Sequence, residues 1–175
     1  MVKQNKFTEK LQSTVLENSK SKDWFYAVGE WYLLDWDEDW DCGSACICGK
    51  ENIKYLFTIK NRHNGNELGY IGSTCIQKFG RPDIYDEAKT IEELYRLQRA
   101  YKEKQRLDLS MFSRKLIEYL YYDGAFDNGY YSAKDTFRAL RDMYNKKNPL
   151  TYRQQNMVTA IIMQNIIPYL RGKLN

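Results

Sequence analysis

The chain has 175 residues, of which 43% are hydrophobic and 29% are charged, with ten glycines and three prolines. This composition is typical of a globular protein with one or two small domains, and it excludes low-complexity and collagen-like chains. No apolar run approaches the ~20 residues that a membrane span requires. The polar start of the chain lacks the apolar stretch of a signal peptide. We therefore expect a cytoplasmic protein, whose cysteines stay reduced.

The formal net charge of +4 is unevenly distributed along the chain. Residues 1–22 carry a net +3, residues 23–89 a net −5, and residues 90–175 a net +6. A local excess of charge selects partners more strongly than the total does. The sequence indicates three parts: an N-terminal helix or arm over 1–22, a β-rich domain over 23–82 and a helical domain over 83–175.

The first predicted element is a helix within residues 4–20, because Phe7, Leu11 and Val15 recur at helical spacing. The segment "WFYAVGEWYLLDW", which begins at Trp24, is aromatic and typical of a strand.

An acidic run, "DWDEDWD", follows this strand-like segment. In an extended chain, alternate residues point to opposite faces, so one face would present carboxylates and the other Trp36 and Trp40. Such a strip can mimic nucleic-acid phosphates and occupy a basic groove of a partner protein. The alternative is a solvated acidic loop with both tryptophans packed in the core. The candidate partner-binding residues are Asp35, Asp37, Glu38, Asp39 and Asp41.

Three of the four cysteines lie within seven positions, in "CGSACIC", and the fourth is Cys75. The residues between them predict a compact unit: a tight turn at Gly49, a strand, a hairpin turn at Asn64-Gly65 and a returning strand. Ser73 or Thr74 is placed to cap a short helix whose first turn holds Cys75, where the helix dipole favours a thiolate. A turn, a hairpin and a helix that supply ligands in this order make a treble-clef-like zinc site.

A closed structural zinc site uses four nitrogen or sulfur ligands. Cys46, Cys48 and Cys75 are the first three candidates for binding Zn²⁺. The fourth is either Cys42, four residues before Cys46, or His63, the single histidine, near the hairpin tip. We favour Cys42, because it completes an all-sulfur site. The alternative is four free thiols.

The segment "CICGKENIKYLFTIKNRHNGNELGYIGSTCIQKF" resembles small zinc-binding accessory proteins of phages and mobile elements of Gram-positive bacteria. The likeness covers roughly residues 24–81, with a weaker likeness near the C-terminus. It implies a zinc-binding protein in a bacterial host cell that acts on nucleic acid or blocks host machinery. The residues that carry it are Glu30, Trp31, Cys46, Cys48, Gly49, Ile59, Asn61, Ile71, Gly72, Ser73, Cys75, Lys78 and Phe79.

The rest of the chain predicts helices from about Thr90 onward. Capping-box patterns occur at Thr90, Ser132 and Thr151, each with an acidic residue or glutamine three positions later. Another helix is predicted to begin near Ser110, and Pro168 is predicted to kink or end the last one. The fold class is therefore α+β: a strand, a small zinc-stabilised unit and a helical C-terminal half.

Basic residues are the candidate contacts for nucleic acid, around the hairpin and in "RLQRAYKEKQR". Tyr95 and Tyr101 offer stacking surfaces within that stretch. A solvated helix face is the alternative. The candidates are Lys54, Lys60, Arg62, Lys78, Arg96, Arg99, Lys102, Lys104 and Arg106.

The sequence favours a non-catalytic protein, and no catalytic residue is assigned. Tyr70, Ile71 and Gly72 match half of the GIY-YIG nuclease signature, but Tyr55-Leu56-Phe57 stands where the other half belongs. An HNH-type nuclease needs more than one histidine. We predict a zinc-binding protein that binds nucleic acid or a nucleic-acid-handling complex. The alternatives are an inhibitor of a host defence or replication protein, similar to anti-CRISPR proteins, and a degenerate GIY-YIG-like nuclease.

Overall fold

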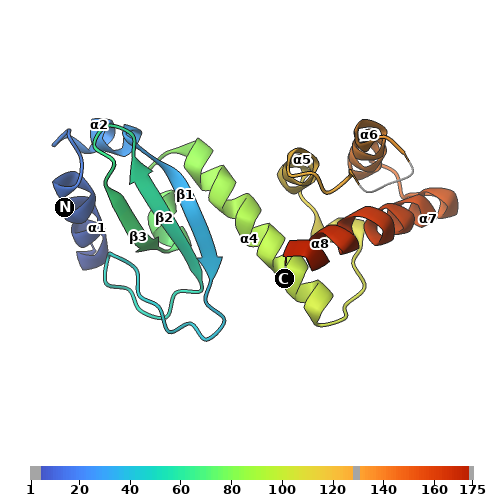
Figure 1. The fold of residues 1–175 in the computed structure, drawn as a ribbon, viewed down its shortest axis with the longest axis horizontal. Coiled ribbons are helices and arrows are strands. Elements are labelled where there is room, and N and C mark those ends of the chain that lie inside the picture. The colour runs from blue at the N-terminus through green and yellow to red at the C-terminus, as the bar shows by residue number, and fades with distance from the viewer. Residues whose placement is uncertain (1–4, 128–130, 174–175) are drawn as a thin grey trace. The chain divides into compact units, whose positions relative to one another are not determined.

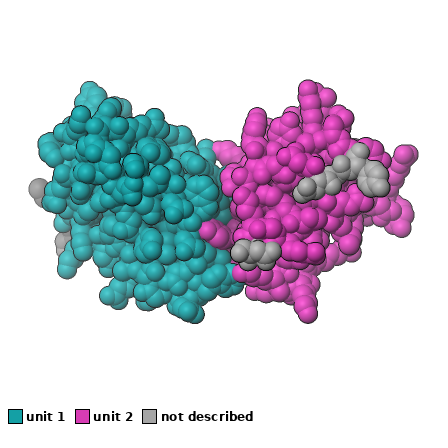
Figure 2. Space-filling model, viewed as in Figure 1, with its two compact units in different colours: residues 1–91 teal, residues 92–175 magenta. Residues whose placement is uncertain are grey.

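The computed structural model describes residues 5–127 and 131–173, which form helices and one small antiparallel sheet (Figure 1). The predicted α+β class is confirmed. The chain packs into two compact units, unit 1 over residues 1–91 and unit 2 over residues 92–175 (Figure 2). The sequence predicts an N-terminal helix or arm over 1–22; a helix forms there over Lys6–Glu17 and belongs to unit 1.

Unit 1 contains the sheet, whose strand order is β1-β2-β3 with antiparallel neighbours. The predicted hairpin at Asn64-Gly65 joins β2 to β3, and Gly65 adopts a positive φ of 76° that such a turn requires. The elements are α1 (Lys6–Glu17), α2 (Trp24–Gly29), β1 (Trp31–Glu38), β2 (Tyr55–Asn61), β3 (Glu67–Ile71), α3 (Ser73–Gln77) and the first part of α4 (Pro82–Lys102).

The predicted strand from Trp24 is wrong over its first six residues, which form α2. Asp23 caps this helix by accepting a hydrogen bond from the Tyr26 backbone N–H at 3.3 Å. The cap and the burial of Ala27 and Val28 outweigh the strand preference of the aromatic residues. The strand itself begins at Trp31.

The core of unit 1 lies between the sheet and its helices, and α1 contributes the predicted apolar residues Leu11 and Val15. Each side chain of this core is less than a tenth exposed. The largest of the fully buried side chains in this unit are Trp31, Phe57, Leu11, Ile59, Ile71, Ile76 and Ile91.

In the part of unit 2 that the structure describes, every secondary-structure element is helical. Its elements are the second part of α4, the 3₁₀ turn Leu109–Met111, α5 (Arg114–Tyr122), α6 (Ala133–Tyr144), α7 (Tyr152–Ile161), the π-helical turn Ile162–Ile166 and α8 (Ile167–Lys173). One apolar cluster forms the core of this unit. It includes Leu94, Leu97, Phe112, Leu116, Ile117, Leu120, Phe126, Leu140, Val158, Ile162, Ile166 and Leu170.

Two of the three predicted caps are confirmed. Ser132 accepts a hydrogen bond from the Asp135 N–H at the start of α6, and Thr151 forms a complete capping box with Gln154 at the start of α7. The cap predicted at Thr90 is wrong, because α4 begins at Pro82 and Thr90 lies inside it. Proline suits the first helical position, where its missing N–H costs nothing.

The C-terminal helix continues through Pro168, which lies in α8. Proline has no N–H to donate to the carbonyl one turn earlier. The regular α-helical hydrogen-bond pattern changes in the π-helical turn Ile162–Ile166, immediately before α8. In the described residues, the helices are too short or too polar for any of them to traverse a bilayer.

Candidate metal centre

Cys46, Cys48 and Cys75 form a group of buried thiols in unit 1. Their sulfur atoms all lie within 4.8 Å of one another, and each residue is at most 5% exposed. Thiolates bound to one zinc ion, with Zn–S bonds of about 2.3 Å, lie roughly 3.8 Å apart. The three sulfurs therefore need only a small closure to bind one metal ion.

A tight turn places the first two thiols. The Cys46 N–H donates to the Lys50 carbonyl at 2.8 Å, and the Gly49 N–H donates to the Cys46 carbonyl at 2.7 Å. Gly49 has a φ of +91°, which side-chain-bearing residues rarely adopt. The turn is held at its base by a bridge between Ser44 and Ile53. The sequence predicts this turn and its glycine, and the structure confirms both.

The third thiol comes from the first turn of α3, as predicted, but the cap differs. Gly72 is the N-cap residue and makes no side-chain hydrogen bond, so the predicted capping by Ser73 or Thr74 is wrong. The Gly72 N–H instead donates to the Cys46 sulfur at 3.4 Å. A Cβ at position 72 would lie 3.3 Å from the Ile53 side chain, so glycine permits this close approach.

The thiols share protons unevenly. A hydrogen bond from the Cys75 thiol, with further ones from the Cys48 and Gly72 N–H groups, lowers the pKa of Cys46 to about 5. The same pairing, together with burial, raises the pKa of Cys75 well above its usual value. The pairing therefore favours the thiolate form of Cys46 over that of Cys75. Metal binding must displace the remaining protons, which makes metal affinity depend on pH.

The thiols line a cavity of about 170 Å³ that also has polar walls. The other lining residues are Lys50, Asn52, Ile53, Lys54, Tyr55, Gly72, Ser73 and Thr74. Lysine and hydroxyl groups beside a thiolate cluster offset its negative charge.

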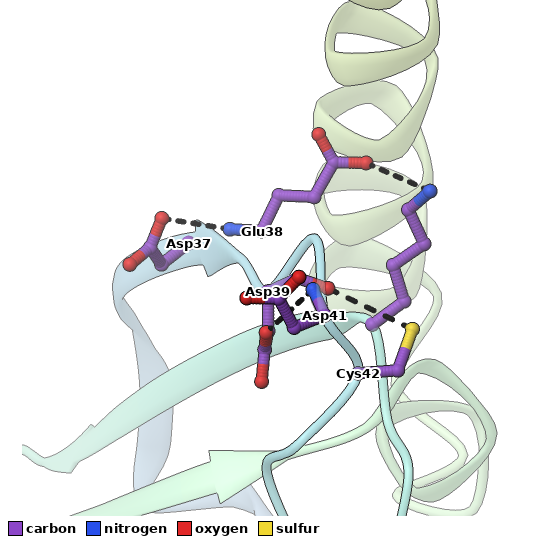
Figure 3. Close-up of polar contacts among 6 residues, drawn as sticks. Asp37, Glu38, Asp39, Asp41 and Cys42 are labelled. Atoms are coloured by element: carbon purple, nitrogen blue, oxygen red, sulfur yellow. Dashed lines mark hydrogen bonds and ion pairs between the residues drawn. The ribbon is translucent and has the colours of Figure 1, made fainter.

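Neither candidate for the fourth ligand belongs to the group of three. Cys42 is half-buried, and its thiol donates to the Asp39 carbonyl at 3.7 Å (Figure 3). His63 is exposed in the hairpin turn, where its backbone N–H donates to Asn61. The structure therefore assembles three of the four predicted thiols.

The acidic run does not form the predicted four-carboxylate face. β1 ends at Glu38, so Asp39 and Asp41 lie in the following loop. Asp39 accepts hydrogen bonds from the Ser44 N–H and hydroxyl at 2.8 and 2.6 Å, and the Ser44 contacts lower its pKa. Glu38 is buried in an ion pair with Lys54 at 3.5 Å (Figure 3). Asp35, Asp37 and Asp41 remain exposed.

Most of the basic candidates around the hairpin have partners within unit 1. Lys54 pairs with Glu38 and lies over the Trp40 ring, Lys60 pairs with Glu67 at 2.6 Å, and Lys78 donates to Thr8. Arg62 is exposed and lies over the Tyr32 ring, 5.3 Å from its centroid. These cations therefore have contacts within unit 1, and their role in binding nucleic acid stays a prediction.

The basic candidates of "RLQRAYKEKQR" do not share one helix face. α4 ends at Lys102, and Lys104 has a positive φ of 58° where the chain turns. Arg96, Lys102, Lys104 and Arg106 are exposed, whereas Arg99 is half-buried. Their role in binding nucleic acid stays a prediction.

A buried polar network near the hairpin turn is absent from the sequence analysis. The Glu30 carboxylate accepts hydrogen bonds from the Lys20 N–H, the Ser21 N–H and the Asn61 side chain at 2.7–2.9 Å. Burial alone would raise the pKa of Glu30, but these hydrogen bonds lower it below its usual value. Asn61 in turn accepts from the backbone of the hairpin turn. Glu30 and Asn61 both belong to the motif that carries the resemblance described above. Their place in that motif was the one sequence signal that pointed to this network.

Comparisons with known proteins give no relative for this arrangement. No protein-family model matches the chain, and neither a curated protein nor a solved structure matches it.

Proposed function

We propose that this protein is a non-catalytic zinc-binding protein whose unit 1 is a treble-clef-like module. The supporting observation is the group of three buried thiols contributed by a turn and by the first turn of a helix. Soft thiolate ligands suit zinc, copper(I) and iron–sulfur clusters. A tetrahedral zinc ion fits a site whose purpose is to hold a hairpin and a short helix together.

Cys42 is our proposed fourth ligand. It is the remaining cysteine and it precedes Cys46 by four residues. Its binding requires a rearrangement of the loop between them, in which Ser44 bridges to Ile53. His63 is less suitable because it lies at the turn end of the hairpin. Cys75 follows the opposite end of β3, whose five residues separate the two ends by roughly 16 Å.

The proposed binding partner is nucleic acid or a nucleic-acid-handling complex. Unit 2 carries fifteen Lys and Arg against nine Asp and Glu, a net charge of +6. This excess favours a polyanion. Together with the motif resemblance, it supports an accessory protein of a phage or mobile element that acts in the cytoplasm of a bacterial host.

Two measurements test this proposal. Native mass spectrometry should find one zinc ion per chain, retained in the wild type and lost from a Cys46→Ser variant. Fluorescence anisotropy with labelled DNA and RNA should show binding whose affinity falls steeply between about 50 and 200 mM salt. A metal-free protein would contradict the zinc site, and a flat salt response would contradict polyanion binding.

The second candidate function is inhibition of a host defence or replication protein. The exposed carboxylates of Asp35, Asp37 and Asp41 favour it, since they offer negative charge to a basic groove. A triple Asp→Asn variant that still captures the same host protein as the wild type would contradict this function.

A further inference from the structure

The paired helices α5 and α6 present an aromatic and cationic surface in unit 2. They run antiparallel, because Arg114 at the start of α5 donates to Asn145 after the end of α6 at 3.4 Å, while Tyr121 near the end of α5 contacts Phe137. We name this surface, formed by Tyr121, Tyr122, Lys134, Phe137, Arg138 and Arg141, the α5–α6 face.

Aromatic rings form the centre of the α5–α6 face. Tyr121 stacks on Phe137 with centroids 4.5 Å apart and planes inclined by 23°. Tyr122 contacts Tyr121 edge-on at 5.4 Å and is 85% exposed. The Tyr122 ring therefore has a face available to water and is oriented by its neighbour.

Cations follow one side of α6 beside these rings. Lys134, Arg138 and Arg141 recur at positions i, i+4 and i+7, which share a helix face. Lys134 and Arg138 are exposed, and the Arg141 guanidinium lies 5.4 Å from the centroid of Phe137. The three span roughly 10 Å along the helix axis, so they form a short row of positive charge that can follow the backbone of one strand.

Carboxylates near this row are already engaged. Asp135 accepts from the hydroxyl of Ser132 at the start of α6. Asp142 lies 3.6 Å from Arg141 on the surface, so a phosphate competes with this carboxylate for the Arg141 guanidinium. The opposite sides of the two helices supply the core, with Leu116 and Leu120 from α5 and Leu140 from α6 fully buried. Tyr121 and Phe137 also pack against this core, whereas Tyr122, Lys134 and Arg138 are exposed and therefore contribute little to folding.

We propose that the α5–α6 face binds single-stranded nucleic acid. The Tyr122 ring stacks on an unpaired base, and Lys134, Arg138 and Arg141 contact consecutive phosphates. A single strand fits better than a duplex, because the bases of a duplex stack on each other and leave no face for a side chain. This inference rests on the proposed function and assigns it a surface and a class of nucleic acid.

Fluorescence anisotropy on the full chain tests this surface, with a labelled oligothymidylate of about 20 nucleotides and a duplex of the same length. Tyr122→Ala should weaken single-strand binding about tenfold. Arg138→Gln should lower the slope of log affinity against log salt by about one. The matched controls are Tyr152→Ala and Arg153→Gln, which change exposed residues of α7 and should bind like the wild type. Circular dichroism checks that all four variants are folded.

The outcomes separate this inference from the proposed function. A wild-type protein that binds neither probe contradicts direct nucleic-acid binding, and with it the surface. Wild-type binding that Tyr122→Ala weakens no more than Tyr152→Ala does would overturn the α5–α6 face and leave nucleic-acid binding standing. A preference for the duplex would overturn the single-strand assignment. Weaker single-strand binding by Tyr122→Ala and a lower salt slope for Arg138→Gln, with both control variants unchanged, support the α5–α6 face as the binding surface.

Discussion

Unit 1 and unit 2 differ in charge and in the interactions that stabilise them. Unit 1 has a net charge of −2, a small sheet, a buried carboxylate and three clustered thiols. Unit 2 has a net charge of +6 and is built around one apolar cluster of helical residues. A small sheet with buried polar groups needs every partner in place, whereas an apolar core tolerates more change. We therefore expect unit 1 to depend on a metal ion and unit 2 to fold without one.

Loss of one thiol should have the largest effect. In small zinc modules, metal binding contributes on the order of 10 kcal/mol, so Cys75→Ser should abolish the cooperative unfolding of unit 1. Thermal unfolding followed by circular dichroism, together with zinc content, measures this. Cys42→Ser is the informative partner variant: a fourth ligand predicts weakened zinc affinity, and wild-type affinity would exclude Cys42 from the site.

Truncation of a fully buried aromatic residue should be next in size. Phe126→Ala removes a ring from the core of unit 2 and should lower the free energy of unfolding by about 4 kcal/mol. Phe25→Ala makes the same chemical change at a residue of unit 1 that is 78% exposed, and should change it by less than about 0.5 kcal/mol. Urea denaturation measures both free energies of unfolding. Equal effects of the two substitutions would contradict the burial of Phe126 and the exposure of Phe25.

The buried carboxylate of unit 1 gives a smaller effect that depends on pH. Glu30→Gln replaces one of the two accepting oxygens by an amide donor, which then faces either the Ser21 N–H or the Lys20 N–H, and should cost about 2 kcal/mol at neutral pH. The pKa of Glu30 is lower in the folded protein, so its contribution is complete above the unfolded-state value of about 4.5 and is lost as the pH falls further. Urea denaturation at several pH values measures this loss. Glu17→Gln, at an exposed residue of α1, is the control, and an equally small effect of both changes would argue against the network.

The smallest predicted effect concerns a helix cap in unit 2. Thr151→Ala removes the hydroxyl that accepts from the Gln154 N–H, one half of the capping box of α7, and should cost about 1 kcal/mol. Thr151→Ser keeps the hydroxyl and should retain most of the stability, as measured by urea denaturation. Indistinguishable alanine and serine variants would show that the cap contributes nothing.

Local chemistry explains which features the sequence could predict. The Asn64-Gly65 turn, the Cys46–Lys50 turn and the caps at Ser132 and Thr151 depend on neighbouring residues, and all of them form. The clustering of Cys46 and Cys48 with Cys75 followed from the same reasoning, because the hairpin between them is locally encoded.

Features that depend on distant partners could not be predicted. The Glu30 network joins residues up to 31 positions apart, and nothing in the local pattern indicates that this carboxylate is buried. Asp39 turns toward Ser44, and Glu38 pairs with Lys54, so alternation alone misplaced the acidic run. The helix at Trp24–Gly29 has a local cap in Asp23, but the burial of Ala27 and Val28, which outweighs the strand preference of the aromatic residues, depends on the rest of unit 1.

Hydrogen exchange after removal of metal tests the central claim most directly. With one zinc ion held by the thiols of unit 1, addition of a chelator should expose the amides of β2, β3 and α3 to exchange, while those of α5 and α6 keep their protection. If the chelator left the exchange rates of the unit 1 amides unchanged, the claim that a bound metal ion stabilises unit 1 would be contradicted.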